Sequence, residues 1–324
     1  MLGGVSFMVK EIFGVPKIVE EAREIAKAKA AKSGKEGKKP GLFWILVVLI
    51  TFGVLILAEM ISGVGDLFAE LILRAIFGKD AITSTISMGV SLYSLIVITV
   101  IYMLYTKFIE GRPIRTLGFV KKGFAVQYLI GLVVGFAAFG IAVLFCKLTG
   151  SIDIRLSDNI NPLVIIFVFG GWMIQGMEEE VCCRGFMLTS LARRYSVTFG
   201  VIANAVLFAA LHLMNPGIGV LPFINLILFG LFASIMFVKT GNIWMCSAVH
   251  TIWNFVQGNF FGIQVSGNDL MDSIFYTDFV SGKELLNGGA FGLEGGLGVT
   301  VSMIIGIVIL MLIPGKKIEV TAKE

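Results

Sequence analysis

Residues 161–194 read NPLVIIFVFGGWMIQGMEEEVCCRGFMLTSLARR, an apolar run that leads directly into charged residues. The first part, 161–177, carries no charge over nearly the length that a membrane-spanning helix needs. Three glutamates and an arginine then follow in 178–184 without any turn signal between them. Ionisable side chains inside a bilayer are costly and usually mark a functional site. This stretch therefore predicts both a membrane-embedded helical protein and the place of its chemistry.

The composition of the whole chain supports a membrane protein. Hydrophobic residues make up 56% and charged residues 15% of the 324 residues, whereas soluble domains show about 45–50% and about 25%. These values exclude a disordered chain, a nucleic-acid-binding domain and an ordinary cytosolic enzyme, so we expect no nucleic-acid partner. We predict an all-α polytopic membrane protein with about eight transmembrane helices around a polar intramembrane cavity. The predicted spans are 42–62, 83–106, 124–146, 162–192, 197–215, 217–238, 242–262 and 298–314.

Lysine and arginine concentrate at both ends of the chain and in alternate connections between the spans. Positive charge in short connections stays on the cytoplasmic side. We therefore predict a basic cytoplasmic segment at 1–41, a transmembrane domain at 42–314 and a cytoplasmic tail at 315–324. Short cytoplasmic loops and the absence of organelle-sorting signals favour a prokaryotic plasma membrane.

Three segments outside the spans have a recognisable character. Residues 65–78 carry charges at helical spacing and are predicted to lie at the outer interface. Residues 17–32 predict an amphipathic helix, either lying on anionic lipid or simply solvated. The connection 263–297 is long, acidic and rich in glycine, and its run 287–298 is typical of a flexible loop.

Helix geometry separates the roles of the charged residues in the fourth span. Side chains four residues apart share a helix face, so Glu180 and Arg184 can form an ion pair. Glu179 points elsewhere and lacks that partner. A partly desolvated carboxylate without a cation suits a general base. We therefore assign chemistry to Glu179 and support to Glu180 and Arg184.

Both histidines of the chain, His212 and His250, lie within apolar spans. His250 and Asn254 share one face of the seventh span. At 1.5 Å per residue, Glu179 lies ~20 Å above the cytoplasmic edge and the other three at similar depth. We expect the four side chains to meet around one cavity, provided that the fourth span is one helix through Leu191.

In chain order, EEVCCR at 179–184, FAALH at 208–212 and HTIWN at 250–254 fit EExxxR, FxxxH and HxxxN. This pattern resembles the CAAX protease and bacteriocin-processing family of intramembrane proteases, also called Abi proteins or type II CAAX prenyl endopeptidases. The resemblance covers about 160–260, the predicted protease core. It implies an eight-helix protease with a conical cavity open to the cytoplasm.

The resemblance also implies roles for the matching residues. Glu179 and His212 would activate water, and His250 and Asn254 would form the oxyanion hole. It implies glutamate-activated water without a cofactor. The alternative is zinc, since His212, His250 and Glu179 also form a thermolysin-like donor set, although HExxH is absent.

The implied partners are membrane lipid and a peptide substrate that is small and hydrophobic or lipid-modified. Two other functions stay open at this point: a non-catalytic peptide-binding immunity protein, and a transporter that uses the buried Glu, Arg and His cluster. No internal repeat of the kind common in transporters is visible. We expect the cysteines to be buried, reduced thiols: Cys146, Cys182, Cys183 and Cys246.

Overall fold

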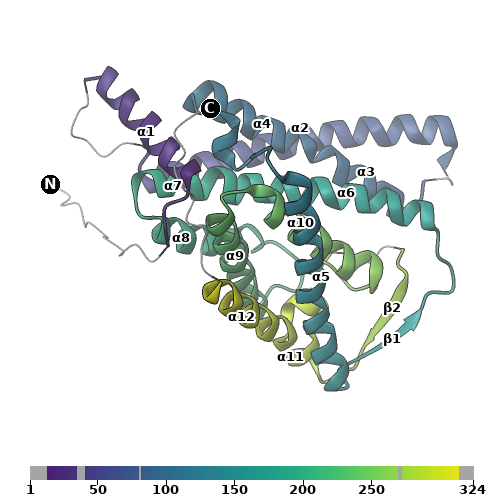
Figure 1. Cartoon of the computed structure of the whole chain (residues 1–324). Coiled ribbons are helices and arrows are strands. Elements are labelled where there is room, and N and C mark those ends of the chain that lie inside the picture. The colour runs from purple at the N-terminus through teal and green to yellow at the C-terminus, as the bar shows by residue number, and fades with distance from the viewer. Residues whose placement is uncertain (1–12, 35–40, 80–81, 269–271, 314–324) are drawn as a thin grey trace.

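The computed structural model describes residues 13–34, 41–79, 82–268 and 272–313. The chain is mostly helical, with one small two-stranded sheet (Figure 1). The predicted 1–41 segment and acidic loop are thus described in part, and the predicted tail 315–324 lies outside the described residues. The α-helices and strands are α1 (Lys17–Lys32), α2 (Trp44–Phe77), α3 (Ser84–Ser94), α4 (Ile96–Leu104), α5 (Phe124–Leu148), β1 (Ile152–Leu156), α6 (Pro162–Glu180), α7 (Thr189–Arg194), α8 (Val197–Leu211), α9 (Val220–Thr240), α10 (Ile243–Phe255), β2 (Phe275–Phe279), α11 (Glu284–Asn287) and α12 (Leu297–Leu312). The π-helices are η2 (Tyr105–Glu110), η4 (Val181–Leu188) and η5 (Val256–Phe260), and the 3-10 helices are η3 (Ile114–Leu117), η6 (Gly289–Phe291) and η7 (Leu293–Gly295).

Within the described residues, four helices are long and apolar enough to cross a membrane: α2, the continuous run Ser84–Glu110, α5 and α9. Two shorter apolar helices, α8 and α12, accompany them. The polytopic membrane architecture is therefore confirmed in its general form. A helix also occupies the fourth and seventh predicted spans, but the count of eight crossings stays a prediction.

The first predicted span is too short, because α2 continues through 65–78 and ends only at Phe77. The charges in this outer half are satisfied within the protein. Arg74 pairs with Glu70 at 2.5 Å, one helical turn away, and Ser91 of α3 donates to Asp66 at 2.5 Å. Neighbours on the same helix and on α3 thus remove the electrostatic reason for the helix to stop. The interfacial location of this segment stays a prediction.

The fourth predicted span is one continuous helix from α6 through η4 to α7. This meets the condition on which the convergence of the site depended. All eight residues of η4 are buried. On the N-terminal side of η4, Gly176 lets α6 approach α10 closely, since a Cβ there would lie 2.7 Å from the backbone nitrogen of Thr251. The two helices that carry most of the predicted site are therefore in direct backbone contact.

The described part of the acidic connection, residues 263–268 and 272–297, is folded against the helices, whereas the sequence predicted a flexible loop at 287–298. Its strand β2 pairs antiparallel with β1. Gly288 and Gly292 adopt positive φ angles of 87° and 85°, which few other residues tolerate. The buried amide of Asn225 donates to the carbonyls of Glu294 and Gly296 at 2.7 and 2.9 Å. The glycines here permit a compact turn, and two carbonyls of that turn accept hydrogen bonds from Asn225.

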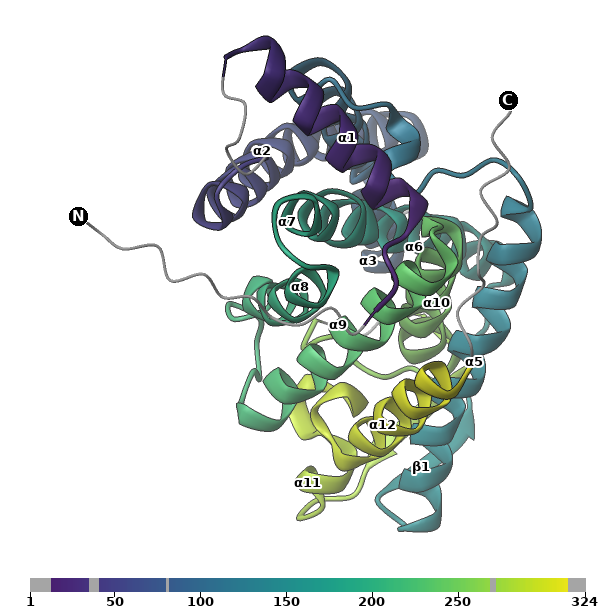
Figure 2. The ribbon, with the colours of Figure 1, turned by 60° about the vertical axis from the view of Figure 1, so that its left-hand side comes forward.

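Helix α1 packs on the protein, and neither sequence-based alternative for 17–32 describes it. Its apolar face, including Val19 and Ala22, is buried and lies against α7 (Figure 2). The guanidinium of Arg23 donates to the carbonyl oxygen of Ala192 at 2.8 Å and to that of Tyr195 at 3.1 Å. The amphipathic pattern is therefore explained by docking on the C-terminal end of α7.

Candidate functional site

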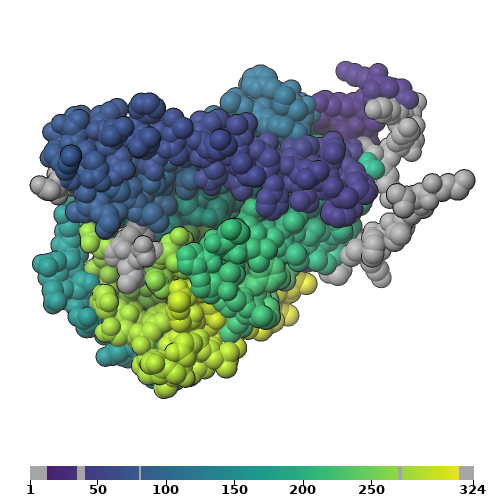
Figure 3. Space-filling model, turned by 180° about the vertical axis from the view of Figure 1, so that it is seen from behind, coloured from purple at the N-terminus to yellow at the C-terminus, as the bar shows by residue number. Residues whose placement is uncertain are grey.

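A cavity of about 310 Å³ lies among the helices and receives all four residues assigned to the chemistry. Glu179 comes from α6, His212 from the end of α8, and His250 and Asn254 from α10. From behind, α2 forms the upper edge of the molecule and the region of α8 and α9 lies below it (Figure 3). Both α2 and α8 contribute to the cavity walls.

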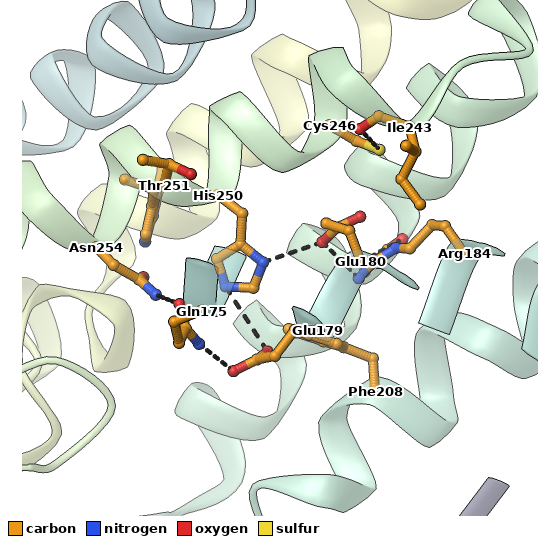
Figure 4. Close-up of polar contacts among 12 residues, drawn as sticks. Gln175, Glu179, Glu180, Arg184, Phe208, Ile243, Cys246, His250, Thr251 and Asn254 are labelled. Atoms are coloured by element: carbon orange, nitrogen blue, oxygen red, sulfur yellow. Dashed lines mark hydrogen bonds and ion pairs between the residues drawn. The ribbon is translucent and has the colours of Figure 1, made fainter. Parts of the chain in front are cut away.

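Glu180 stands at the centre of the supporting interactions, as the helix geometry predicted. Its Oε1 accepts from Nη1 of Arg184 at 2.8 Å and lies 3.0 Å from Nδ1 of His250 (Figure 4). Both side chains of the Glu180–Arg184 pair are fully buried. The Arg184 guanidinium also stacks over the ring of Phe208 at 4.6 Å. Phe208 of the FxxxH motif therefore packs on the arginine of the EExxxR motif.

Glu179 faces the opposite nitrogen of the same imidazole. Its Oε2 lies 3.7 Å from Nε2 of His250, and its Oε1 accepts a hydrogen bond from the amide of Gln175 (Figure 4). The side chain is 23% exposed, in contrast to the fully buried Glu180. His250 is thus held between two carboxylates, one buried and one open to the cavity.

Gln175 is a site residue that the sequence reasoning missed. Its amide nitrogen donates to Glu179, and its Oε1 accepts from Nδ2 of Asn254 at 2.9 Å. One side chain therefore positions both a carboxylate on α6 and an amide on α10. The available signal was spacing, because Gln175 lies one turn before Glu179 and is the one amide in the charge-free run 162–177.

His212 lies at the C-cap of α8, since the helix ends at Leu211 and not at 215 as predicted. Its Nδ1 lies 3.0 Å from the carbonyl oxygen of Phe208. A carbonyl oxygen only accepts, so Nδ1 carries the proton and Nε2 is the acceptor of this ring. Asn204, one turn before Phe208, does not belong to the site; it donates to Ser234 at 2.8 Å.

The zinc alternative requires Glu179, His212 and His250 as the donor set. Within the part of the chain that the structure describes, no three His, Cys, Asp or Glu side chains form a group arranged to hold a metal ion. His250 also directs Nδ1 to Glu180 and Nε2 to Glu179. The choice between metal-free chemistry and zinc therefore stays a prediction. The four cysteines are buried and free, as expected.

The cavity also contains residues that no motif indicated. Glu59 of α2 and Glu178 of α6 line it. At another part of the wall, Glu294 accepts from Nε1 of Trp253 at 2.9 Å and from the hydroxyl of Ser266 at 2.7 Å. The acidic loop therefore contributes directly to the cavity. The sequence did not indicate this, because the loop lies far from the motifs along the chain.

Comparison with known proteins agrees with the three motifs. Residues 161–256, which are 96 of 324, match the family described as Rce1-like, type II CAAX prenyl endopeptidase. No curated protein and no solved structure matches the chain. The matched segment contains Glu179, His212, His250 and Asn254, the residues brought together in the cavity. The resemblance predicted from the sequence is therefore confirmed: residues 161–256 are similar to the Rce1-like type II CAAX prenyl endopeptidases.

Proposed function

We propose that the protein is an intramembrane endopeptidase that hydrolyses a peptide bond in a small hydrophobic or lipid-modified peptide. The observation that carries this proposal is the convergence of Glu179, His212, His250 and Asn254 on one cavity. Amide hydrolysis needs a base for water and donors for the developing oxyanion. The four side chains offer both kinds of group on separate walls.

Glu179 is the general base in this proposal. Its Oε2 receives no hydrogen bond from any described residue, so this oxygen can accept a proton from water. His212 has Nε2 as its acceptor because Nδ1 donates to Phe208, and it lines the same cavity. The glutamate and the histidine together orient and activate the attacking water.

His250 and Asn254 supply the oxyanion donors. Nδ1 of His250 donates to Glu180, and an imidazole that also donates from Nε2 is cationic. The buried carboxylate of Glu180 stabilises that cation, and Arg184 holds the carboxylate in place. Asn254 uses one amide hydrogen on Gln175 and has a second for the substrate.

The apolar part of the cavity wall suits the proposed substrate. Leu55, Met88 and Leu92 line it from α2 and α3. The protein is an integral multi-pass membrane protein, and we place both termini in the cytoplasm of a prokaryotic plasma membrane. We propose that no cofactor takes part in the reaction, and a chelator tests that separately.

The test compares purified wild type with Glu179→Gln and His212→Ala on quenched fluorescent peptides, one of them prenylated. Each variant is expected to lower kcat by about 10²–10⁴-fold, the usual contribution of a general acid or base. Thermal unfolding in detergent should be unchanged for Glu179→Gln. Glu284→Gln, which changes an exposed carboxylate of α11, is the matched control and should cleave as wild type does.

Cleavage that persists in Glu179→Gln or His212→Ala would show that the assignment is wrong. Peptide binding without cleavage by wild type would favour an immunity or binding protein. Loss of cleavage on addition of a chelator, restored by zinc, would overturn the metal-free mechanism.

A further inference from the structure

Glu178 is a buried carboxylate with no hydrogen-bond or ion-pair partner among the described residues. It precedes the two glutamates of the EExxxR motif, so the motif leaves it unassigned. The residue is 4% exposed and lines the cavity. Among the described residues, none donates a hydrogen bond to it or forms an ion pair with it. An ionised carboxylate in such surroundings is costly unless a proton or a cation accompanies it.

The neighbours of Glu178 increase the negative charge of this wall. Glu59 of α2 lines the same cavity and is likewise without a described donor. Glu178 is close enough to Glu59 and Glu179 for electrostatic repulsion. Meanwhile, no lysine or arginine is among the described residues that line the cavity. A cleft whose wall carries carboxylates focuses its field and attracts groups of the opposite sign.

The other two carboxylates that line the cavity, Glu179 and Glu294, each accept at least one hydrogen bond from the protein. Glu294 accepts from Trp253 and from both the backbone nitrogen and the hydroxyl of Ser266. Glu179 accepts from Gln175. Among the described carboxylates that line the cavity, Glu178 and Glu59 therefore have no donor on either oxygen, whereas Glu179 keeps one free oxygen, Oε2.

We propose that Glu178 and Glu59 form a subsite for a positively charged group of the substrate, a lysine or arginine side chain near the scissile bond. The subsite rests on the proposed peptidase function and narrows its substrate to hydrophobic peptides that carry a basic residue. The cation would pair with Glu178 while Glu179, the next residue on α6, acts on the neighbouring peptide bond. A glutamate at the same substrate position would be rejected by like charge.

The experiment uses quenched peptides that are identical except at one position, which holds lysine, norleucine or glutamate, and moves that position along the peptide. Norleucine keeps the aliphatic stem and removes the charge. Wild type should favour lysine over norleucine by at least about tenfold in kcat/KM at one position, the scale of a buried charge pair. Glutamate should be the poorest of the three.

The variants then test which residues cause that preference. Glu178→Gln keeps the size of the side chain and should bring the lysine-to-norleucine ratio close to one. Glu59→Gln should lower the ratio less, since Glu59 is more exposed to solvent. Glu284→Gln lies outside the cavity lining and should keep the wild-type ratio. Circular dichroism and thermal unfolding would check that each variant is folded.

A wild type that does not discriminate, or a ratio that survives in both Glu178→Gln and Glu59→Gln, would overturn the subsite. So would an equal loss on all three peptides, because that result indicates a structural role. If wild type cleaves nothing, peptide-induced thermal shifts separate the two proposals. Tighter binding of the lysine peptide, lost in Glu178→Gln, would keep the subsite and reject the peptidase; equal binding would reject both.

Discussion

Glu178 and Glu180 are two residues apart on one helix, yet only Glu180 has hydrogen-bond and ion-pair partners in the described part of the protein. Glu180 points to the α10 side, where Arg184 and His250 both contact its Oε1. Glu178 lines the cavity together with Glu59 of α2 and has no described donor, although it is almost as deeply buried. The comparison teaches that burial alone does not mark a ligand site. A buried charge that the fold satisfies supports the structure, whereas one that the fold leaves unsatisfied is available to a ligand.

The largest effect on stability is expected when the ion-pair partner of Glu180 is removed. Arg184→Met leaves a fully buried carboxylate without its cation and removes the stacking on Phe208. We expect a loss of about 3–5 kcal/mol in the free energy of unfolding, as for other broken buried pairs. Thermal or denaturant unfolding in a fixed detergent measures it.

The double variant Glu180→Leu with Arg184→Met is the control for that prediction. Replacing both partners removes the unpaired charge, so much of the lost stability should return. Activity should not return, because His250 then lacks the carboxylate that holds Nδ1. A single Arg184→Met variant as stable as wild type would show that the pair does not support the fold.

A smaller effect is expected at Gln175, which connects Glu179 of α6 with Asn254 of α10. Gln175→Leu removes the hydrogen bonds to both Glu179 and Asn254. We expect kcat to fall by about tenfold, with a stability change of about 1 kcal/mol per lost hydrogen bond. Steady-state kinetics and unfolding of the same preparation measure the two quantities.

Gln175→Glu separates the two contacts of this side chain. It can still accept from Asn254, but it cannot donate to Glu179 and places a like charge beside it. We expect it to lower kcat more than Gln175→Leu. Equal activity of both variants and wild type would show that Gln175 only fills space.

The smallest effect is expected at an exposed ion pair whose arginine, like Arg184, also stacks over an aromatic ring. Arg155 of β1 lies 3.3 Å from Asp278 of β2, and both side chains are more than half exposed. Solvent screens such a pair, so Arg155→Ala should cost no more than about 1 kcal/mol. Its unfolding at low and high salt measures the effect. A loss as large as that of Arg184→Met would remove the distinction between satisfied buried pairs and surface pairs.

Much of the site followed from local geometry. The spacing of Glu180 and Arg184 determines a shared helix face, and the ion pair is present. The same rule placed His250 and Asn254 together on α10, where both reach the cavity. Gln175 lies four residues before Glu179 and so shares its helix face. The sequence did not mark it as a site residue, because an uncharged amide in an apolar run is not by itself a sign of function.

The length of α2 and the folding of the glycine-rich segment could not be predicted from neighbouring residues in the sequence. The charges of 65–78 suggested a break, but partners on α3 let α2 continue. The glycines of 287–298 suggested flexibility, but Asn225 on α9 caps the turn. In each case the deciding group lies far away in sequence, so no local pattern could reveal it.

The sequence by itself determined that this is a helical membrane protein and which helices carry its chemistry, because hydropathy and the 3.6-residue period act within one segment. The similarity of residues 161–256 to the type II CAAX prenyl endopeptidases was visible in three short motifs for the same reason. Only the tertiary structure decided that Glu179 faces His250 and that Glu178 has no donor among the described residues. Those environments depend on α2, α9 and α10 closing around one helix, and a charge is stabilised or not by what packs against it.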